Sequence, residues 1–244
     1  MMRADAQRQG WRELPFGTLN DVTGPGCGLI LAPHPDDESL GCGGLIAACC
    51  HAGRPPIVAI LTDGGMSHPG SKAYPHERLV RLREAEARDA VSLLGLPQDR
   101  LLFLREPDAN APRAGEAFDR VVERIVGLVR RFRCSAILAP WRLDPHYDHE
   151  AAFLIAAEVA ARLRIRHLAY PVWGWTLPPD HDIDAGTPFG WRLDIAHYLG
   201  RKLRAIAAHR SQYGELITDD PSGFRLPPEM LRVFTSNYET FLLP

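Results

Sequence analysis

The sequence lacks the features by which several classes of protein are recognised. Its 244 residues contain no internal repeat, no low-complexity tract and no Gly/Ser-rich linker, so one domain is the simplest organisation. No apolar run reaches the length of a membrane span, and the first residues, MMRADAQRQGWRELP, contain no apolar signal-peptide segment. The five cysteines form no C-x-x-C pair, which argues against a disulfide framework or a structural zinc knuckle. We therefore expect reduced, mainly buried thiols and a cytoplasmic protein.

A strong charge of either sign is also missing. The formal net charge is -2 at pH 7, without the basic excess of proteins that bind nucleic acids or anionic membranes. The contents of 45% hydrophobic and 24% charged residues are ordinary for a globular protein with a large core. We expect a small-molecule partner, no nucleic acid and no membrane span, and a homo-oligomer stays an open alternative.

Short apolar runs alternate with longer amphipathic segments along the chain. Strands are predicted at 28–32, 56–62, 100–104, 135–141 and 167–173, and helices at about 38–53, 76–95, 116–132 and 149–165. Such an alternation predicts a single α/β domain with a mainly parallel sheet covered on both faces. A further helix at about 195–210 and the tail (PPEMLRVF, YETFLL) are expected to cover the sheet and close an edge. The expected boundaries are an N-terminal extension over 1–27 and the domain over 28–244.

A cluster of acids follows the first strand, in LILAPHPDDESLGCGG (29–44). Pro33 and Pro35 restrict the backbone and hold His34 extended between the strand and the next helix. Asp36 and Asp37 are compatible with simple capping of that helix, which stabilises by roughly 0.3–1 kcal/mol per group. Capping leaves the histidine unexplained, and an imidazole three residues from a carboxylate is a metal-ligand pattern.

A second cluster, in RLDPHYDHE, stands at the same kind of position. His146, Asp148 and His149 lie between the strand predicted at 135–141 and the next helix. The carboxyl ends of parallel strands share one edge of the sheet, so the two clusters can converge on one cation. Two histidines and one carboxylate leave zinc an open position, as catalytic zinc sites do. Such a site lowers the pKa of a bound water to about 7, and a neighbouring carboxylate can take its proton.

These motifs resemble those of the PIG-L/LmbE-like zinc-dependent de-N-acetylases. The resemblance rests on APHPDDE and HYDH, supported by LTDGG (61–65), RLREAEARDAVSLLG (81–95) and the segment from Lys202 to Gln212 that ends in HRSQ. It covers about residues 28–212 and implies a Rossmann-like three-layer α/β sandwich. It also implies removal of acetyl from an N-acetylglucosamine-type amino sugar conjugate, with metal-bound water as the nucleophile.

The resemblance assigns roles to individual residues. The implied zinc ligands are His34, Asp37 and His149, and the implied general base is Asp36. His146 would be the acid or oxyanion stabiliser, with Asp148 as its orienting partner. Arg81 would be the substrate-binding arginine of an R-x-x-E pattern. Another divalent metal, such as iron or cobalt, suits the same ligands. Tyr147 stands where the family commonly has proline, which changes loop stiffness and leaves the ligand spacing intact.

Two other functions and one segment remain open at this stage. A nucleotide-binding Rossmann module would need G-x-G-x-x-G directly after the first strand, where this chain has HPDDE. A non-catalytic metal-binding protein is the second alternative. The Trp-rich segment 171–192 is either a loop that covers the sheet edge or a wall on which a sugar ring stacks.

Overall fold

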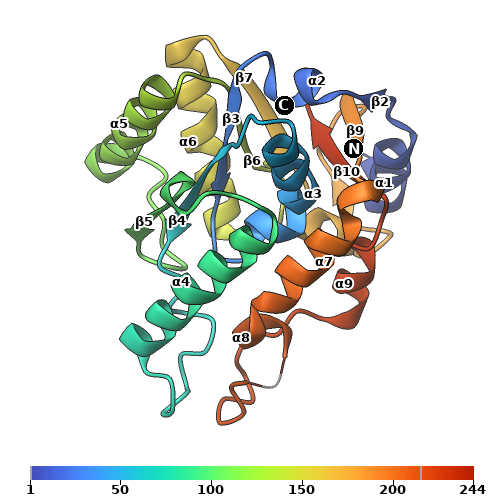
Figure 1. The fold of residues 1–244 in the computed structure, drawn as a ribbon. Coiled ribbons are helices and arrows are strands. Elements are labelled where there is room, and N and C mark those ends of the chain that lie inside the picture. Colours follow the sequence, from blue (N-terminus) through green and yellow to red (C-terminus); the bar gives the residue numbers. More distant parts are fainter. Residues whose placement is uncertain (1, 215) are drawn as a thin grey trace.

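The computed structural model describes residues 2–214 and 216–244 and has a central sheet of eight strands (Figure 1). The strand order across the sheet is β2-β9-β10-β7-β6-β3-β4-β5. Its strands are β2 (Phe16–Gly17), β3 (Cys27–Ala32), β4 (Ile57–Thr62), β5 (Leu101–Glu106), β6 (Cys134–Pro140), β7 (Arg166–Tyr170), β9 (Gly190–Asp194) and β10 (Tyr238–Leu242). A separate two-stranded sheet pairs β1 (Met2–Arg3) with β8 (Asp182–Ile183).

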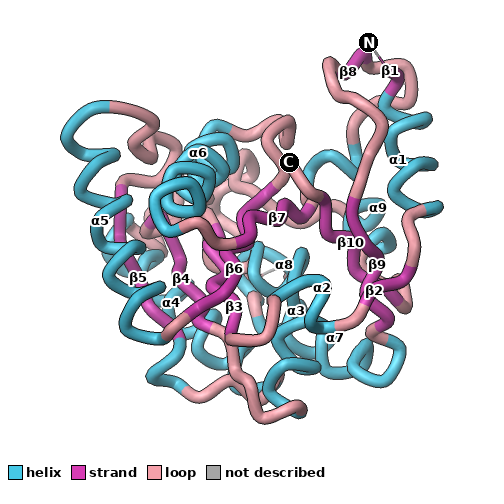
Figure 2. The backbone as a smooth tube through the Cα atoms, turned by 90° about the horizontal axis from the view of Figure 1, so that it is seen from above, coloured by secondary structure: helices cyan, strands magenta, loops and turns pink. Residues whose placement is uncertain are grey.

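Helices cover both faces of the sheet and make a three-layer sandwich (Figure 2). The α-helices are α1 (Ala4–Glu13), α2 (Leu19–Thr23), α3 (Asp37–His51), α4 (His76–Leu93), α5 (Gly115–Phe132), α6 (Tyr147–Leu163), α7 (Leu199–Ala208), α8 (Arg210–Tyr213) and α9 (Pro228–Val233). Short 3-10 helices are η1 (Gln98–Arg100), η2 (Trp173–Thr176) and η3 (Ala196–Tyr198). The predicted α/β class is therefore confirmed.

The alternation of side chains along β3 explains why both faces are apolar. Leu29 and Leu31 pack into the cluster formed with α5 and α6, while Ile30 and Ala32 pack into the cluster formed with α3, α4 and α7. All four side chains are fully buried. A strand covered on both sides reads as a continuous apolar run, as this one does.

The order of the strands places a crevice beside β3. The chain goes from β3 outward to β4 and β5, and then returns to the other side of β3 to form β6 and β7, all parallel. Such a reversal is the topological switch point at which α/β sheets bind their ligands. The loops after β3 and β6, which carry the two predicted clusters, therefore leave neighbouring strands at this point.

The two ends of the chain extend the sheet beyond the five predicted strands. β10 lies antiparallel between β7 and β9, and β2 pairs with β9 at the edge. The predicted N-terminal extension packs against the rest of the domain. Its Trp11 is fully buried, and the centroid of its ring lies 5.0 Å from that of Trp141 and 4.8 Å from that of Trp175. None of the helices in the described part of the chain is long and apolar enough to cross a membrane.

Two predicted elements differ from the structure by more than two residues at an end or by a break. The strand predicted at 167–173 ends at Tyr170, because Pro171 has no N–H for the ladder and the next N–H groups bond to a side chain of another loop. The helix predicted at 195–210 is divided into η3, α7 and α8. The break between α7 and α8 is at His209, whose imidazole contacts the buried Glu38.

Candidate active site

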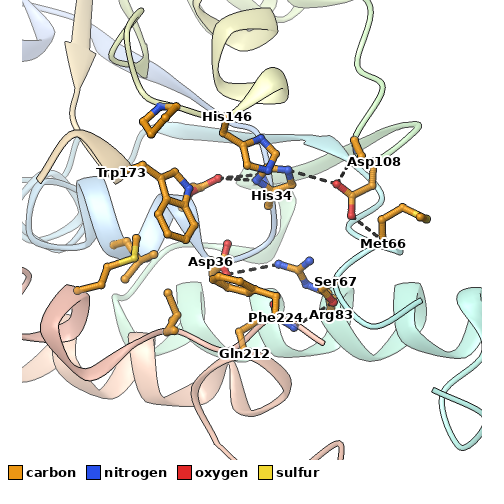
Figure 3. A pocket seen from close by; sticks show the side chains of 16 residues that line it. His34, Asp36, Met66, Ser67, Arg83, Asp108, His146, Trp173, Gln212 and Phe224 are labelled. Carbon is orange, nitrogen blue, oxygen red and sulfur yellow. Dashed lines mark hydrogen bonds and ion pairs between the residues drawn. The ribbon is translucent and has the colours of Figure 1, made fainter. Parts of the chain in front are cut away.

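The loops that follow β3 and β6 meet at a cavity of about 330 Å³ (Figure 3). Its polar lining comes from His34, Asp36, Asp37, Ser67, Arg83, Asp108, His146 and Gln212, and its apolar lining includes Leu40, Met66, Trp173, Phe224, Leu226 and Met230. The structure therefore brings the two sequence clusters together at the switch point of the sheet. Three acids line this space and a fourth, Asp148, lies behind His34, and this negative charge makes the cavity unfavourable for the phosphates of a nucleotide.

The three predicted metal ligands converge on one point. The Oδ2 atom of Asp37 lies 3.1 Å from Nδ1 of His34 and 3.3 Å from Nε2 of His149. All three side chains are buried. His34 and His149, together with His146, also offer ring nitrogens within 4.8 Å of one another. Distances slightly above 3 Å between donor atoms are those expected around a cation that holds each of them at about 2 Å.

The opposite nitrogen of each ligand histidine faces a carboxylate. Nε2 of His34 lies 3.0 Å from Oδ2 of Asp148, and Nδ1 of His149 lies 3.0 Å from Oδ2 of Asp144. With the ring protons on the nitrogens that face Asp148 and Asp144, the lone pairs of both imidazoles point toward Asp37. Nε2 of His149 is buried and has no hydrogen-bond partner among the described residues. Three electron-pair donors that face one another in this way fit a bound metal ion, and the carboxylates behind them fix the ring orientation.

The shifted pKa values of His149 and Asp37 show that this group of side chains favours positive charge. Burial lowers the pKa of His149, but Asp37 and Asp144 outweigh burial and raise it to about 9. Burial would raise the pKa of Asp37, whereas His149 and His34 hold it well below its usual value. The carboxylates thus outnumber the imidazoles, and a cation bound among them would reduce their mutual repulsion.

A second donor set shares His34 but suits a metal less well. Nε2 of His34 lies 3.3 Å from Oδ1 of Asp108, and these two groups with Asp148 form another cluster of potential ligands. Both carboxylates already accept backbone N–H groups: Asp148 from Ala109 and Ala111, and Asp108 from Met66. They act here as hydrogen-bond acceptors that hold the β5–α5 loop against His34.

Asp36 is held beside the ligands in an unusual backbone conformation. Its φ of 154° is uncommon for a residue with a side chain, and such strain persists only where the surroundings enforce it. Its N–H donates to Oε2 of Glu38 at 2.9 Å, and its carboxylate lies 3.4 Å from Nη2 of Arg83. Burial raises the pKa of Asp36 to about 6, and Arg83 opposes the rise.

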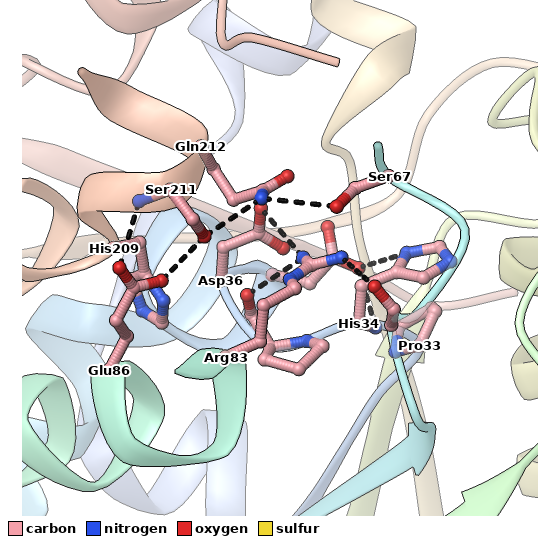
Figure 4. Close-up of polar contacts among 12 residues, drawn as sticks. Pro33, His34, Asp36, Ser67, Arg83, Glu86, His209, Ser211 and Gln212 are labelled. Atoms are coloured by element: carbon pink, nitrogen blue, oxygen red, sulfur yellow. Dashed lines mark hydrogen bonds and ion pairs between the residues drawn. The ribbon is translucent and has the colours of Figure 1, made fainter. Parts of the chain in front are cut away.

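Arg83 and a buried polar network support this conformation from below (Figure 4). Arg83 donates to the carbonyl oxygens of Pro35 and Gly64 at 3.0 and 2.9 Å. Oε1 of Glu38 contacts His209 Nε2 at 3.1 Å, and it also accepts the hydroxyl of the neighbouring serine. His209 of the HRSQ motif therefore positions Glu38, which in turn holds the backbone N–H of Asp36.

His146 is the N-terminal cap of α6 and lines the cavity. Its Nδ1 accepts the N–H of Asp148 at 3.2 Å, and its ring lies edge-on to His34 with centroids 4.6 Å apart. Burial lowers its pKa to about 4, and the nearby His34 and His149 add to the effect. The predicted partnership with Asp148 needs correction, since the carboxylate of Asp148 is directed at His34 and only its backbone N–H reaches His146.

Arg81, which was predicted to bind the substrate, lies outside the cavity. Its side chain is 72% exposed and pairs with Glu77 at 3.6 Å. Two residues correspond to about 200° of helix rotation, so Arg83 lies on the opposite, buried face of α4 and lines the cavity instead. Within α4 the pattern R-x-x-E occurs twice, at 81–84 and at 83–86, and only the second pair, Arg83 with Glu86, is buried.

Sequence reasoning missed Asp144 and Asp108 and left the Trp-rich segment open. Asp144 is in the same RLDPHYDHE loop as the ligand, which was an available signal. Of the three tryptophans of the segment, only Trp173 lines the cavity, and its ring packs edge-to-face on Phe224 with centroids 5.6 Å apart. Nothing in the sequence indicates that Phe224, about fifty residues later, completes this wall.

The chain was then compared with known proteins. The family model described as GlcNAc-PI de-N-acetylase (PIG-L) matches residues 29–160. A probable N-acetyl-alpha-D-glucosaminyl L-malate deacetylase 2 of Bacillus anthracis is 28% identical over 195 residues, which cover 78% of this chain and 83% of that protein. A diacetylchitobiose deacetylase of Thermococcus kodakarensis is 29% identical over 209 residues, or 82% and 73% of the two chains.

Solved structures show the same fold. N,N'-diacetylchitobiose deacetylase from Pyrococcus horikoshii aligns with a TM-score of 0.66 and 20% identity, covering 98% of this chain and 91% of that one. The family model spans more than half of the 244 residues and includes both ligand loops. The chain therefore belongs to the PIG-L family, and it is an amide hydrolase of the N-deacetylase class.

Proposed function

We propose that this enzyme removes the acetyl group from an N-acetylglucosamine-type amino sugar conjugate with the help of one divalent metal ion, zinc by ligand type. The observation that carries the proposal is the convergence of His34, Asp37 and His149, with a carboxylate behind each imidazole. The names of the two relatives, a probable N-acetyl-alpha-D-glucosaminyl L-malate deacetylase and a diacetylchitobiose deacetylase, support the choice of substrate class.

The proposed metal ligands are the two imidazole nitrogens and the Asp37 oxygen. This mixed set suits zinc, although iron or cobalt fits it as well. A divalent cation bound there would polarise the amide carbonyl and make a water molecule acidic near neutral pH. The buried Nε2 of His149, which has no hydrogen-bond partner within residues 2–214 and 216–244, is the atom that such an ion would satisfy.

Asp36 is the proposed general base. Its carboxylate lines the cavity beside Asp37, and Arg83 at 3.4 Å limits the side chain to this place. Asp36 accepts a proton from the water that attacks the amide carbon, and it can return this proton to the nitrogen when the carbon–nitrogen bond breaks. Acetate and a free amine are the products.

His146 is the proposed stabiliser of the carbonyl oxygen. Because Nδ1 accepts the Asp148 N–H, the proton of the neutral ring is on Nε2, which can donate to the oxygen as it gains negative charge. On the apolar side of the cavity, Trp173 and Phe224 offer a surface for the apolar face of a sugar ring. Ser67, Arg83 and Gln212 remain as hydrogen-bonding groups for its hydroxyls.

The proposed reaction can be tested by measuring acetate release from a panel of N-acetylglucosamine conjugates in the presence of zinc. We expect release from at least one conjugate and its loss after treatment with a chelator. An acetylated peptide and an acetylated polyamine are the controls. Cleavage of a control without cleavage of any sugar conjugate would show that the substrate class is wrong.

The His149→Ala variant tests the metal ligands. Wild-type protein should contain about one equivalent of metal by elemental analysis, because the three ligands form one site. The variant should lose most of it, since it lacks one of three ligands. His51→Ala, which changes an exposed histidine at the end of α3, is the matched control and should keep its metal. Retention of a full equivalent by His149→Ala would rule out this ligand set.

The Asp36→Ala variant separates catalysis from metal binding. Asp36 accepts a proton and is not a proposed ligand, so the variant should keep its metal content while kcat falls by roughly 10²–10⁴-fold. Asp37→Ala, one residue later, should instead lose metal first. Metal-free Asp36→Ala protein, or turnover close to that of the wild type, would contradict this division of roles.

The Asp144→Asn variant tests the carboxylate behind His149. Asparagine keeps the size of the side chain but weakens the acceptor for His149 Nδ1–H, so the affinity for zinc should fall by about 10–100-fold. Competition with a chromophoric chelator measures this change without any assay of activity. Asp194→Asn, at an exposed position, is the control. Equal affinities of the two variants would show that Asp144 serves the loop alone.

A further inference from the structure

Two cysteines stand opposite each other at the beginning of β3 and β6. Cys27 and Cys134 are paired residues of these neighbouring strands, and a register shift follows directly after Cys27. Their Sγ atoms are 3.1 Å apart, and both side chains pack against the cluster beneath α5 and α6. The pair is therefore already oriented sulfur to sulfur on one face of the sheet.

The surroundings make Cys27 the more reactive of the two thiols. Cys27 is half-buried and Cys134 is buried, so small molecules reach Cys27 first. The hydrogen bond from the Cys134 thiol lowers the pKa of Cys27 to about 7 against the opposing effect of burial, and Arg100 contributes in the same direction. The same contact raises the pKa of Cys134.

The other three cysteines provide a contrast within the chain. Cys50 is also half-buried, but burial raises its pKa to about 11. Burial likewise raises the pKa of Cys49 and Cys42. The thiolate is the form that reacts with oxidants, so exposure alone does not select Cys27.

We propose that Cys27 and Cys134 form an oxidative modification site, in which Cys27 reacts with hydrogen peroxide or a small organic hydroperoxide and Cys134 completes a disulfide between β3 and β6. Paired residues of neighbouring strands have Cα atoms about 5 Å apart, within the range that a disulfide spans. With the sulfurs already in contact, the bond needs only a small movement of the side chains.

The chemistry takes two steps. The Cys27 thiolate attacks one peroxide oxygen; the oxygen–oxygen bond breaks, the sulfur is oxidised to sulfenic acid, and the leaving oxygen takes a proton to become water (or an alcohol). The Cys134 sulfur then attacks the Cys27 sulfur. The sulfur–sulfur bond forms as the sulfur–oxygen bond breaks, and the released hydroxide takes the Cys134 proton to give water.

The disulfide would lie at the opposite end of these strands from the cavity. Cys27 and Cys134 are the first residues of β3 and β6, whereas the ligand loops follow their last residues. Six residues of strand correspond to about 20 Å, so the bond should stabilise the sheet without touching the metal ligands. The crosslink joins residues that are 107 apart in sequence. Because it closes such a long loop, it should lower the entropy of the unfolded chain strongly and so stabilise the folded state.

Mass spectrometry of the full-length, metal-loaded protein tests the proposal. After treatment with a few equivalents of hydrogen peroxide at neutral pH and digestion without reductant, we expect a peptide pair linked through Cys27 and Cys134, while Cys50 keeps its free thiol. The oxidised protein should show a Tm higher by roughly 5–10 °C, reversed by dithiothreitol.

Two variants identify the order of reaction. In Cys134→Ser, Cys27 should accumulate as a sulfenic acid that dimedone traps, and in Cys27→Ser, Cys134 should stay reduced. Oxidation of Cys27 no faster than that of Cys50 would overturn the proposal, and so would irreversible oxidation of Cys27 beside a free Cys134 thiol. Both outcomes can be measured by mass spectrometry of the wild-type protein, so the test does not depend on how well the variants fold.

Discussion

The structure depends on one electrostatic constraint: three electron-pair donors from two loops face one another in a buried space. His34 and Asp37 follow β3, His149 follows β6, and each imidazole is turned by a carboxylate behind it. Without a positive charge between them, these groups repel one another and their burial is costly. The sheet topology makes the arrangement accessible, because the two strands are neighbours at the point where the chain reverses direction.

A second buried layer holds the carboxylate of Asp36, the proposed general base, in place. Glu38, Arg83 and His209 make contacts to the backbone or side chain of Asp36 or to one another, and each of them is almost inaccessible to solvent. Their hydrogen bonds offset the strained φ of Asp36. The long-range part of this layer comes from α4 and from the segment after α7, so elements far apart in the sequence determine the position of one side chain.

The sequence was sufficient for the fold class and for the meeting of the two His/Asp loops, since apolar periodicity and the position of these loops after strands are local properties. It was not sufficient for contacts that depend on side-chain direction. Arg81 and Arg83 are indistinguishable as R-x-x-E arginines until the helix is placed against the sheet, and the partner of Asp148 depends on a loop after β5. The strand β9 was missed, and the tail segment YETFLL, expected to close an edge, instead forms β10 between β7 and β9, because such pairings are set by tertiary contacts rather than by short local patterns.

The carboxylate of Asp144 serves two parts of the site at once. Besides contacting the imidazole of His149, it accepts the backbone N–H groups of Val172, Trp173 and Gly174 at 2.7–3.1 Å. Asp144 thereby fixes both the backbone that carries Trp173 and the imidazole of His149, a proposed metal ligand. Phe224 belongs to a separate loop, and its backbone N–H donates to the carbonyl oxygen of Ser67. A substitution in the Phe224 loop should therefore disturb His149 less than one at Trp173, and a library that randomises this loop can change the shape of the cavity while the contact between Asp144 and His149 is kept.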